Sequence, residues 1–184
     1  MSETHDPVVL LLAAGRSSRF LASGGPCHKL EMPLCGLPVL EHVIRAVQAC
    51  GLPWHVVRSA QGDGMGDSIA AGVRATANAS GWLVLPGDLP LITADSLRKV
   101  AQALASAAIV VPTWHRQKGH PVGFAAQCFN DLLQLTGEHG AASIVAAQDA
   151  CGNVLRLALD DQGIVQDVDT LDDLKYVETL MSQR

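Results

Sequence analysis

A loop of cationic residues after an apolar run is the first stretch of the sequence whose residue types could do chemistry. Residues 8–20 read VVLLLAAGRSSRF, and the loop that begins at Gly15 contains Arg16 and Arg19, with Lys29 following further along. Gly15 can adopt a positive φ, and consecutive backbone N–H groups in such a turn form a concave site for an anion. Arginine and lysine side chains bind phosphate oxygens, so the loop is suited to a polyphosphate.

The loop carries neither of the two common phosphate-binding signatures. A Walker A loop requires G-x-x-x-x-G-K-[ST] and a Rossmann dinucleotide loop requires G-x-G-x-x-G, and AAGRSSRF matches neither of them. The alternative to a phosphate site is a solvated basic loop that simply follows a strand. Taken alone, the loop leaves these two interpretations equally open.

Asp88 is a candidate metal ligand. It lies in VLPGDLPLIT, directly after the apolar run Trp82–Pro86. A carboxylate in this position is often only a turn former or a helix cap, but Thr93 and Asp95 can serve the next helix and leave Asp88 free. A hard oxygen ligand that faces a triphosphate loop is what Mg²⁺ uses.

A second acidic pair occurs near the end of the chain, in DVDTLDDL. Asp167 and Asp169 are two residues apart, so in a strand they would project to the same face. The alternative is a structural role in which Asp169 or Thr170 caps the last helix.

Glycines are dense in GDGMGDSIAAGV, residues 62–73. Glycines at this density allow a flat base to lie against the backbone, whose amides and carbonyls read its edge. The alternative is a flexible turn in which Asp67 or Ser68 caps the following helix.

The stretch HRQKGHPVGF, residues 115–124, joins basic side chains to a Gly-His-Pro turn. Generic hairpins have the same composition. The spacing of His115 and His120 matches no common zinc pattern and there is no third ligand, so neither is assigned to a metal.

Short apolar runs alternate with longer helical patterns along the chain. This alternation predicts a layered α/β domain with a mostly parallel sheet, in which ligands bind beyond the carboxyl ends of the strands. The predicted strands are Val8–Ala13, 54–58, Trp82–Pro86, 109–112, 121–125, 153–159 and 163–168. The predicted helices are 38–50, Ile69–Ala77, Ala94–Ala107 with Thr93 as N-cap, Cys128–Leu135, Ser143–Ala150 and Leu171–Met181.

Composition narrows the class of protein. The length of 184 residues predicts a single domain, residues 1–184, and 48% hydrophobic residues are enough for a substantial core. The net charge of −5 disfavours nucleic-acid binding. No run approaches the length of a membrane helix, and no secretory signal is expected. Five scattered cysteines predict reduced thiols in a cytoplasmic protein.

The first loop resembles a known family. LAAGRSSR followed by Lys29 is similar to the L-A-A-G-x-S-x-R motif of nucleotidyltransferases with a GT-A-like Rossmann fold, nearest to the molybdenum cofactor cytidylyltransferase branch. The resemblance implies a three-layer α/β/α Rossmann-like fold with a mostly parallel mixed sheet. It implies that the loop wraps a triphosphate, with Arg19 and Lys29 on the phosphates. The path FLASGGPCH from Arg19 to Lys29 is longer than usual in the family and glycine-rich, which makes it flexible.

Further motifs extend the resemblance over nearly the whole chain. Gly64, Met65 and Ser68 match a segment that contacts base and ribose, and together with the A-A-G loop they correspond to the cytidine-specific pattern. Asp88 matches the magnesium ligand of a G-D-x-P motif, and Asp169, ahead of Asp167, matches a second metal-binding position. The implied nucleotide-binding residues are Leu12, Ala13, Ala14, Gly15, Arg16, Ser17, Gly64, Met65 and Ser68.

The acceptor side departs from the family pattern. Lys118, Gly119 and His120 stand where the family has R-G-H, on the side that receives the acceptor. Lys118 replaces the arginine. The segment GEHGAASIV is similar to the family's G-D-x-G-A-R segment, but Ala142 occupies its arginine position, so the identity of the acceptor is left open.

The resemblance implies a Mg²⁺-dependent enzyme that transfers CMP from CTP to the phosphate of molybdopterin and releases pyrophosphate. Arg19, Lys29 and Asp88 would be catalytic, with Asp88 and Asp169 on the metal. The implied partners are CTP or GTP, the phosphorylated acceptor, and a molybdoenzyme or its chaperone, with no nucleic acid and no membrane. The alternatives are a guanylyltransferase of the same pathway, a sugar-phosphate or alditol-phosphate nucleotidyltransferase, and an accessory protein that binds a nucleotide or cofactor without catalysis.

Overall fold

Most strands of the chain belong to one mixed sheet. The computed structural model describes residues 6–58, 62 and 64–183, and within them the sheet has seven strands in the order β4-β1-β5-β8-β6-β7, with β9 paired to β6. The pairings make five strands parallel to one another, and β7 and β8 run against them. The parallel strands are β1 (Val8–Leu12), β4 (Trp54–Val57), β5 (Gly81–Pro86), β6 (Ile109–Trp114) and β9 (Val154–Ala158); the antiparallel ones are β7 (Gln117–Lys118) and β8 (Val122–Ala125).

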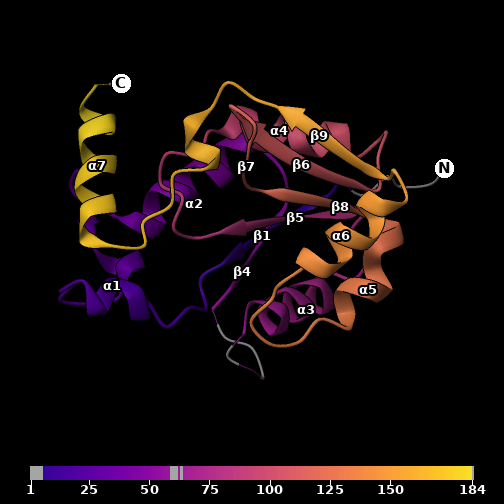
Figure 1. Ribbon diagram of the computed structural model, residues 1–184, viewed down its shortest axis with the longest axis horizontal. Coiled ribbons are helices and arrows are strands. Elements are labelled where there is room, and N and C mark those ends of the chain that lie inside the picture. Colours follow the sequence, from indigo (N-terminus) through magenta and orange to yellow (C-terminus); the bar gives the residue numbers. More distant parts are fainter. Residues whose placement is uncertain (1–5, 59–61, 63, 184) are drawn as a thin grey trace.

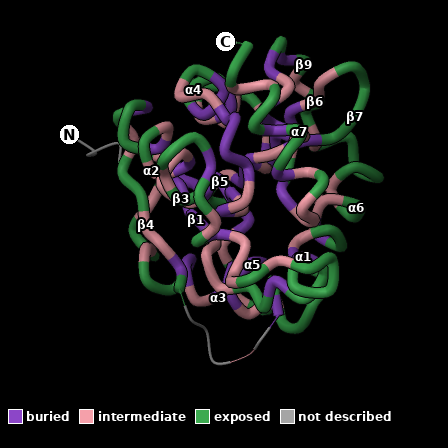
Figure 2. The backbone as a smooth tube through the Cα atoms, turned by 90° about the vertical axis from the view of Figure 1, so that its left-hand side faces the viewer, coloured by how far each residue is buried: buried purple, intermediate pink, exposed green. Residues whose placement is uncertain are grey.

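Helices cover both faces of this sheet (Figure 1). Residues in β1 alternate between two separate cores: Val9 and Leu11 belong to one, Val8 and Leu10 to the other. The first core is completed by α2 (Val39–Cys50) and α4 (Ala94–Ala103), and the second by α3 (Met65–Ala75), α5 (Phe129–Leu133) and α6 (Ala142–Ala150). Figure 2 shows the central strands buried between these layers. The three-layer α/β/α fold and the mostly parallel sheet that we predicted are therefore confirmed.

The carboxyl ends of three neighbouring strands lie level with one another. Leu12 of β1 pairs in register with Val57 of β4 on one side and with Pro86 of β5 on the other. The first residues beyond the strands continue this alignment, because Ala13 N–H donates to the Val57 carbonyl at 2.8 Å and Gly87 N–H donates to the Leu12 carbonyl at 2.9 Å. The loops that follow β1, β4 and β5 therefore start at the same rim of the sheet.

A third core connects the first loop to the C-terminal helix. Phe20 and Leu30 are buried together with Leu174 and Val177. These residues come from α1 (Ser18–Ala22), from the short 3₁₀ helix η1 (Lys29–Glu31) and from α7 (Leu171–Ser182); the small hairpin of β2 (Pro33–Leu34) and β3 (Leu37–Pro38) lies between η1 and α2. Leu171 N–H also donates to Ser23 Oγ at 3.1 Å. Helices α1 and α7 consequently lie at the same end of the molecule (Figure 1).

Residues 163–168 are not the strand that we predicted. They form the end of the 3₁₀ helix η3 (Gln162–Ile164) and then an irregular path. Gly163 lies so close to the Leu91 carbonyl that a Cβ would overlap it, and its N–H donates to the Asp161 carboxylate at 2.8 Å. Because the backbone bonds to a side chain there, it forms no ladder with the neighbouring strand.

Helix boundaries also differ from the sequence-based prediction: α4 ends at Ala103 rather than Ala107, and α5 is shorter than the predicted Cys128–Leu135. Helix α3 begins at Met65 rather than at Ile69, because the Asp67 carboxylate accepts a hydrogen bond from Gly64 N–H at 3.2 Å and so caps the earlier start. Helix α1 was not predicted at all; its formation within the glycine-rich path accompanies the complete burial of Phe20.

None of the helices that the structure describes is both long enough and apolar enough to cross a membrane.

Candidate active site

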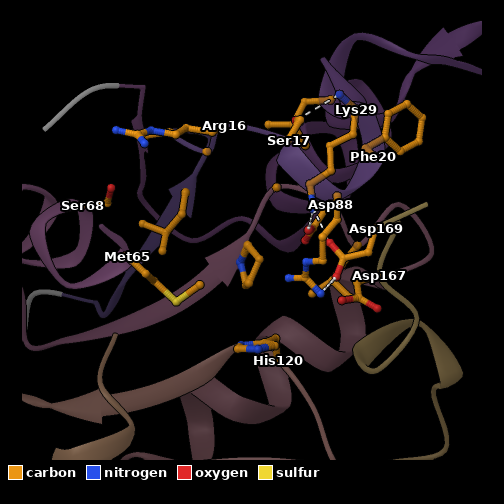
Figure 3. A pocket seen from close by; sticks show the side chains of 18 of the residues that line it. Arg16, Ser17, Phe20, Lys29, Met65, Ser68, Asp88, His120, Asp167 and Asp169 are labelled. Carbon is orange, nitrogen blue, oxygen red and sulfur yellow. Dashed lines mark hydrogen bonds and ion pairs between the residues drawn. The ribbon is translucent and has the colours of Figure 1, made fainter. Parts of the chain in front are cut away.

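A cleft of about 640 Å³ lies at the rim where the strand ends meet (Figure 3). Most of the residues that the sequence nominated line it. These are Leu12, Ala14, Gly15, Arg16, Ser17, Arg19, Lys29, Met65, Ser68, Asp88, Lys118, His120, Asp167 and Asp169. Three nominated residues, Ala13, Gly64 and Gly119, are not among its lining; Ala13 instead lines a neighbouring pocket of about 440 Å³.

A network of ion pairs joins three distant segments inside the cleft. Lys29 Nζ lies 2.6 Å from Asp88 Oδ2 and 2.7 Å from Asp169 Oδ1. Arg19 Nη1 reaches the other oxygen of Asp169 at 2.5 Å. The side chains of Lys29 and Asp88 are each only 15% exposed, whereas Arg19 is 80% exposed. The cations of the first loop and the carboxylates thus meet at one end of the sheet, as the geometric part of the prediction requires.

The electrostatics of this network keep Lys29 charged. Burial by itself lowers the pKa of the Lys29 ammonium, but the Asp88 and Asp169 carboxylates outweigh burial and raise that pKa above its usual value. A lysine with a raised pKa is a permanent cation at neutral pH.

Backbone contacts fix where Asp88 points. A Cβ on Gly87 would lie 2.9 Å from the Leu12 carbonyl, so glycine lets the turn after β5 pack tightly against the end of β1. The Asp88 carbonyl in turn accepts a hydrogen bond from Val168 N–H at 2.9 Å. This bond fastens the acidic segment near residue 168 beside Asp88.

Helix α7 does not use the Asp169 side chain as its cap. Thr170 is the N-cap: its Oγ1 accepts from Asp173 N–H at 3.2 Å, and the Asp173 carboxylate accepts from Thr170 N–H at 2.7 Å. This reciprocal capping box satisfies the helix start. Asp169 is therefore available to Lys29 and Arg19.

Three carboxylates could hold a divalent cation. Each of Asp88, Asp167 and Asp169 offers one oxygen, and these oxygens lie within 4.8 Å of one another. Burial and the neighbouring Asp88 and Asp169 carboxylates raise the pKa of Asp167. A set of clustered hard oxygen donors is the chemistry that Mg²⁺ and Mn²⁺ bind, so the residues fit such an ion. Both Asp167 and Asp169 belong to the cluster.

The phosphate-loop residue with left-handed backbone is Ser17, not Gly15. Ser17 has φ = 52°, and Gly15 is not among the glycines of positive φ. The expectation for Gly15 was therefore wrong. Its lack of a side chain still leaves room, because a Cβ at Gly15 would have no neighbour within 4 Å. A ligand can approach the backbone closely at this point.

The glycines before α3 have a packing role. Gly66 N–H donates to the Gly137 carbonyl at 2.8 Å, and a Cβ on Gly64 would overlap Gly137. Asp67 joins the two segments by accepting from Gly137 N–H at 3.1 Å. The density of glycine thus serves the close approach of residues 64–66 and 136–137. In the cleft, Met65 is exposed, whereas Ser68 is buried and donates to the Gly64 carbonyl at 3.2 Å.

His120 lies across the cleft from Ser17 and Lys29 in the view of Figure 3. Its backbone N–H donates to the Ile164 carbonyl at 2.8 Å, and its Nδ1 is buried without a hydrogen-bond partner among the described residues. Burial lowers the pKa of the imidazole and outweighs the Asp88 carboxylate and a backbone hydrogen bond at Val84, which raise it. Gly119 fits beneath Ile164, where a Cβ would lie 2.6 Å from the carbonyl oxygen. His120 is thus a neutral polar group facing the acidic cluster.

Several lining residues were not singled out from the sequence, and two of them, His28 and Glu138, are polar side chains that can ionise. His28 directly precedes Lys29, and that adjacency is the one signal that could have found it. Glu138 lies in the turn between α5 and α6, and its place in the acceptor-side segment GEHGAASIV is the signal that could have found it.

Comparison with known proteins agrees with this fold. The MobA-like NTP transferase domain family matches the chain over residues 9–61 and 51–151. The bifunctional protein GlmU of Xylella fastidiosa (strain 9a5c) is 28% identical over 85% of this chain, which spans only 36% of the length of that relative.

Two solved structures have the same fold. The complex of Rv0371c from Mycobacterium tuberculosis H37Rv with manganese has a TM-score of 0.71 at 22% identity, with 96% of this chain and 99% of that chain covered. Molybdopterin-guanine dinucleotide biosynthesis protein A from Archaeoglobus fulgidus has a TM-score of 0.66 at 18% identity, with 96% and 100% covered.

The mixed, mostly parallel sheet with a cation-lined loop and an acidic cluster at its carboxyl rim has the α/β fold of an NTP transferase domain. Because the family match extends over more than half of the sequence, the chain belongs to the MobA-like NTP transferase domain family.

Proposed function

We propose that the chain transfers CMP from CTP to the terminal phosphate of molybdopterin. A phosphate oxygen of the acceptor forms a bond to the α-phosphorus of CTP, the bond from that phosphorus to the bridging oxygen breaks, and pyrophosphate leaves with the electron pair. The observation that carries the proposal is the network in which Lys29 and Arg19 meet Asp88 and Asp169 in one cleft. Phosphoryl chemistry of this kind needs positioning and charge stabilisation more than an acid or a base.

Different residues of the cleft bind the triphosphate, neutralise the leaving pyrophosphate and hold the metal. The backbone of Leu12–Ser17 surrounds the triphosphate, with Arg16 at its edge. Lys29 and Arg19 neutralise the charge that builds up on the departing pyrophosphate. Asp88 and Asp169, with Asp167 beside them, would hold Mg²⁺, which supplies Lewis-acid neutralisation of the phosphate oxygens when bound.

The two substrates occupy opposite parts of the cleft in this proposal. Met65 and Ser68, which line the cleft, receive the cytosine and ribose, while Gly64 holds the start of α3 against Gly137. Lys118 and His120 face the acceptor, and Gly119 packs between them against Ile164. The A-A-G loop and the segment Gly64–Ser68 support CTP as the donor, and the MobA-like family supports molybdopterin as the acceptor.

Other assignments within the class remain as alternatives. GTP is favoured as the donor by the name of the Archaeoglobus fulgidus neighbour, and a sugar phosphate as the acceptor by the likeness to GlmU. A nucleotide-binding accessory protein without catalysis would bind CTP and release no pyrophosphate.

The proposal includes a cytoplasmic location and delivery of the product to a molybdoenzyme or its chaperone. The five free cysteines support a reducing compartment.

Calorimetry and a product assay test the proposal together. We expect CTP to bind more tightly than ATP, GTP and UTP in the presence of Mg²⁺, and we expect pyrophosphate release when molybdenum cofactor is added. Asp88→Asn should weaken Mg²⁺-dependent CTP binding, whereas Asp95→Asn, on the exposed face of α4, should not. Equal affinity of the wild-type protein for CTP with and without Mg²⁺ would contradict the assigned metal site. Tight CTP binding without pyrophosphate release would favour the accessory protein.

A further inference from the structure

The phosphate loop and the lysine that accompanies it come from different elements. Gly15, Arg16 and Ser17 follow β1, whereas Lys29 is the first residue of η1. Their relative position therefore depends on contacts between the two segments rather than on either segment alone.

The His28 side chain makes one of these contacts. Its Nε2 lies 2.6 Å from the Gly15 carbonyl oxygen, and its Nδ1 accepts a hydrogen bond from Leu30 N–H at 3.3 Å as the N-cap of η1. A carbonyl only accepts and a backbone N–H only donates, so the ring is neutral with its proton on Nε2. One imidazole thus joins the carbonyl of the phosphate loop to the first turn of the helix that carries Lys29.

A second link runs parallel to the first. Lys29 N–H donates to Ser17 Oγ at 3.2 Å, and Ser17 is buried with left-handed backbone. Ser17 stands at the N-cap position of α1, but its side chain makes no capping bond there. Its hydroxyl therefore serves the link to Lys29 instead of helix α1.

We propose that His28 is a positioning residue for nucleotidyl transfer: its Nε2–H fixes the Gly15–Arg16 peptide plane relative to Lys29, so that backbone and ammonium face one triphosphate. This inference rests on the proposed function. His28 does not touch the ion pairs of Lys29, so its removal affects how the triphosphate is held more than the charge that acts on the departing group.

Three variants at this position separate the two bonds of the ring. Glutamine places an amide N–H near the position of Nε2, and asparagine places a carbonyl oxygen near the position of Nδ1. His28→Gln therefore keeps the bond to Gly15, His28→Asn keeps only the cap of η1, and His28→Ala keeps neither. The matched control is His42→Ala, because His42 Nε2 lies 2.8 Å from the Leu34 carbonyl in a part of the chain outside the cleft.

The experiment measures the KM for CTP, the kcat and the calorimetric Kd for CTP with Mg²⁺, with circular dichroism to verify folding. We expect His28→Ala and His28→Asn to raise KM and Kd about tenfold, the size expected for losing one to two net hydrogen bonds, with kcat changed less than about threefold. His28→Gln and His42→Ala should stay near wild type. In a double-mutant cycle, Ser17→Ala and His28→Ala should be non-additive, because both links act on the same pair of segments.

The outcomes separate the two proposals. Rescue by asparagine rather than glutamine, or a wild-type Kd for His28→Ala, would overturn the role of His28 while leaving nucleotidyl transfer intact. Failure of the wild-type protein to bind any nucleoside triphosphate would overturn both.

Discussion

Lys29 forms ion pairs with two carboxylates of the cleft. Its ammonium contacts two carboxylates that lie 59 and 140 residues away in the sequence. Both contacts are largely shielded from water. Ionic interactions are stronger in such a shielded position than at an open surface. A lysine in this position can transfer its interaction from carboxylate to phosphate oxygens when a nucleotide enters.

Replacing Lys29 with alanine should lower kcat by about 10²–10³, the usual loss when one preorganised electrostatic group is removed. Steady-state release of pyrophosphate from CTP measures this change. Lys99→Ala is the matched control, since Lys99 pairs with Asp95 at 2.7 Å on an exposed helix face. Unchanged turnover in Lys29→Ala would remove Lys29 from the mechanism.

His120 gives the stability of the protein a dependence on pH. The folded protein lowers the pKa of its imidazole below the value of about 6.5 in an unfolded chain, so the unfolded chain binds more protons as the pH falls through that value. Stability is therefore lost on acidification. We expect the decrease in Tm between about pH 7.5 and about pH 5.5 to be smaller in His120→Asn than in wild type.

The control for this prediction is His139→Asn, because His139 lies on an exposed loop. Thermal unfolding of the three proteins at both pH values measures the difference. A decrease in Tm of the same size in wild type and in His120→Asn would show that other groups cause the acid sensitivity.

Among the elements, η3 and α4 are joined by a buried carboxylate. Asp161 Oδ2 accepts from Thr93 Oγ1 at 2.8 Å and from Ser96 Oγ at 2.6 Å, at the start of α4. Its Oδ1 accepts from Gly163 N–H in η3 at 2.8 Å. The next residue of η3, Ile164, accepts a hydrogen bond from His120 N–H through its carbonyl. The Asp161 carboxylate therefore fixes the start of the segment that continues to Asp167 and Asp169.

Asp161→Ala should destabilise the fold by about 3 kcal/mol, because it removes several charge-assisted hydrogen bonds and leaves buried donors without a partner. Urea unfolding measures the free-energy change. Asp95→Ala, in the exposed first turn of the same helix, should change stability far less, because exposed ion pairs contribute little. Equal effects of the two substitutions would show that the Asp161 network does not stabilise this junction.

On the scale of the whole molecule, the cleft brings cations from the first loop into ion pairs with carboxylates from two later segments. Lys29 and Arg19 pair with the carboxylates that would hold a metal, so the same side chains cannot fully serve metal and phosphate until these pairs are broken. In the proposed function, a triphosphate that pairs with the two cations would free Asp88 and Asp169. Binding of nucleotide and metal should therefore be mutually favourable, by the same factor in each direction.

The wild-type protein should bind Mn²⁺ at least about tenfold more tightly with CTP than without it. In the absence of nucleotide, Lys29→Met should bind Mn²⁺ about tenfold more tightly than wild type, because a competing cation is gone. Lys99→Met removes the same charge at a distant surface and should leave the affinity unchanged. Equal Mn²⁺ affinities of wild type and Lys29→Met, measured by electron paramagnetic resonance, would contradict this account.

Local patterns were enough to predict most of the fold. The apolar runs at Val8–Ala13 and Trp82–Pro86 and the helical face of 38–50 have their observed structure because each is decided by burial of its own side chains. The strand predicted for 163–168 was wrong because the hydrogen bonds of that segment go to Asp161 and Asp88, which no local period reveals. The roles of Arg19, Lys29 and Asp88 in catalysis stay predictions.

The sequence by itself determined the chemistry available to this protein: a glycine-ended loop with cations, an aspartate after a buried strand, and an acidic pair near the last helix. Only the tertiary structure decided that these groups meet. The register of β1 with β4 and β5, and the bond from Val168 N–H to the Asp88 carbonyl, bring them to one rim. Distances between remote segments depend on such packing contacts, and residue types alone do not specify them.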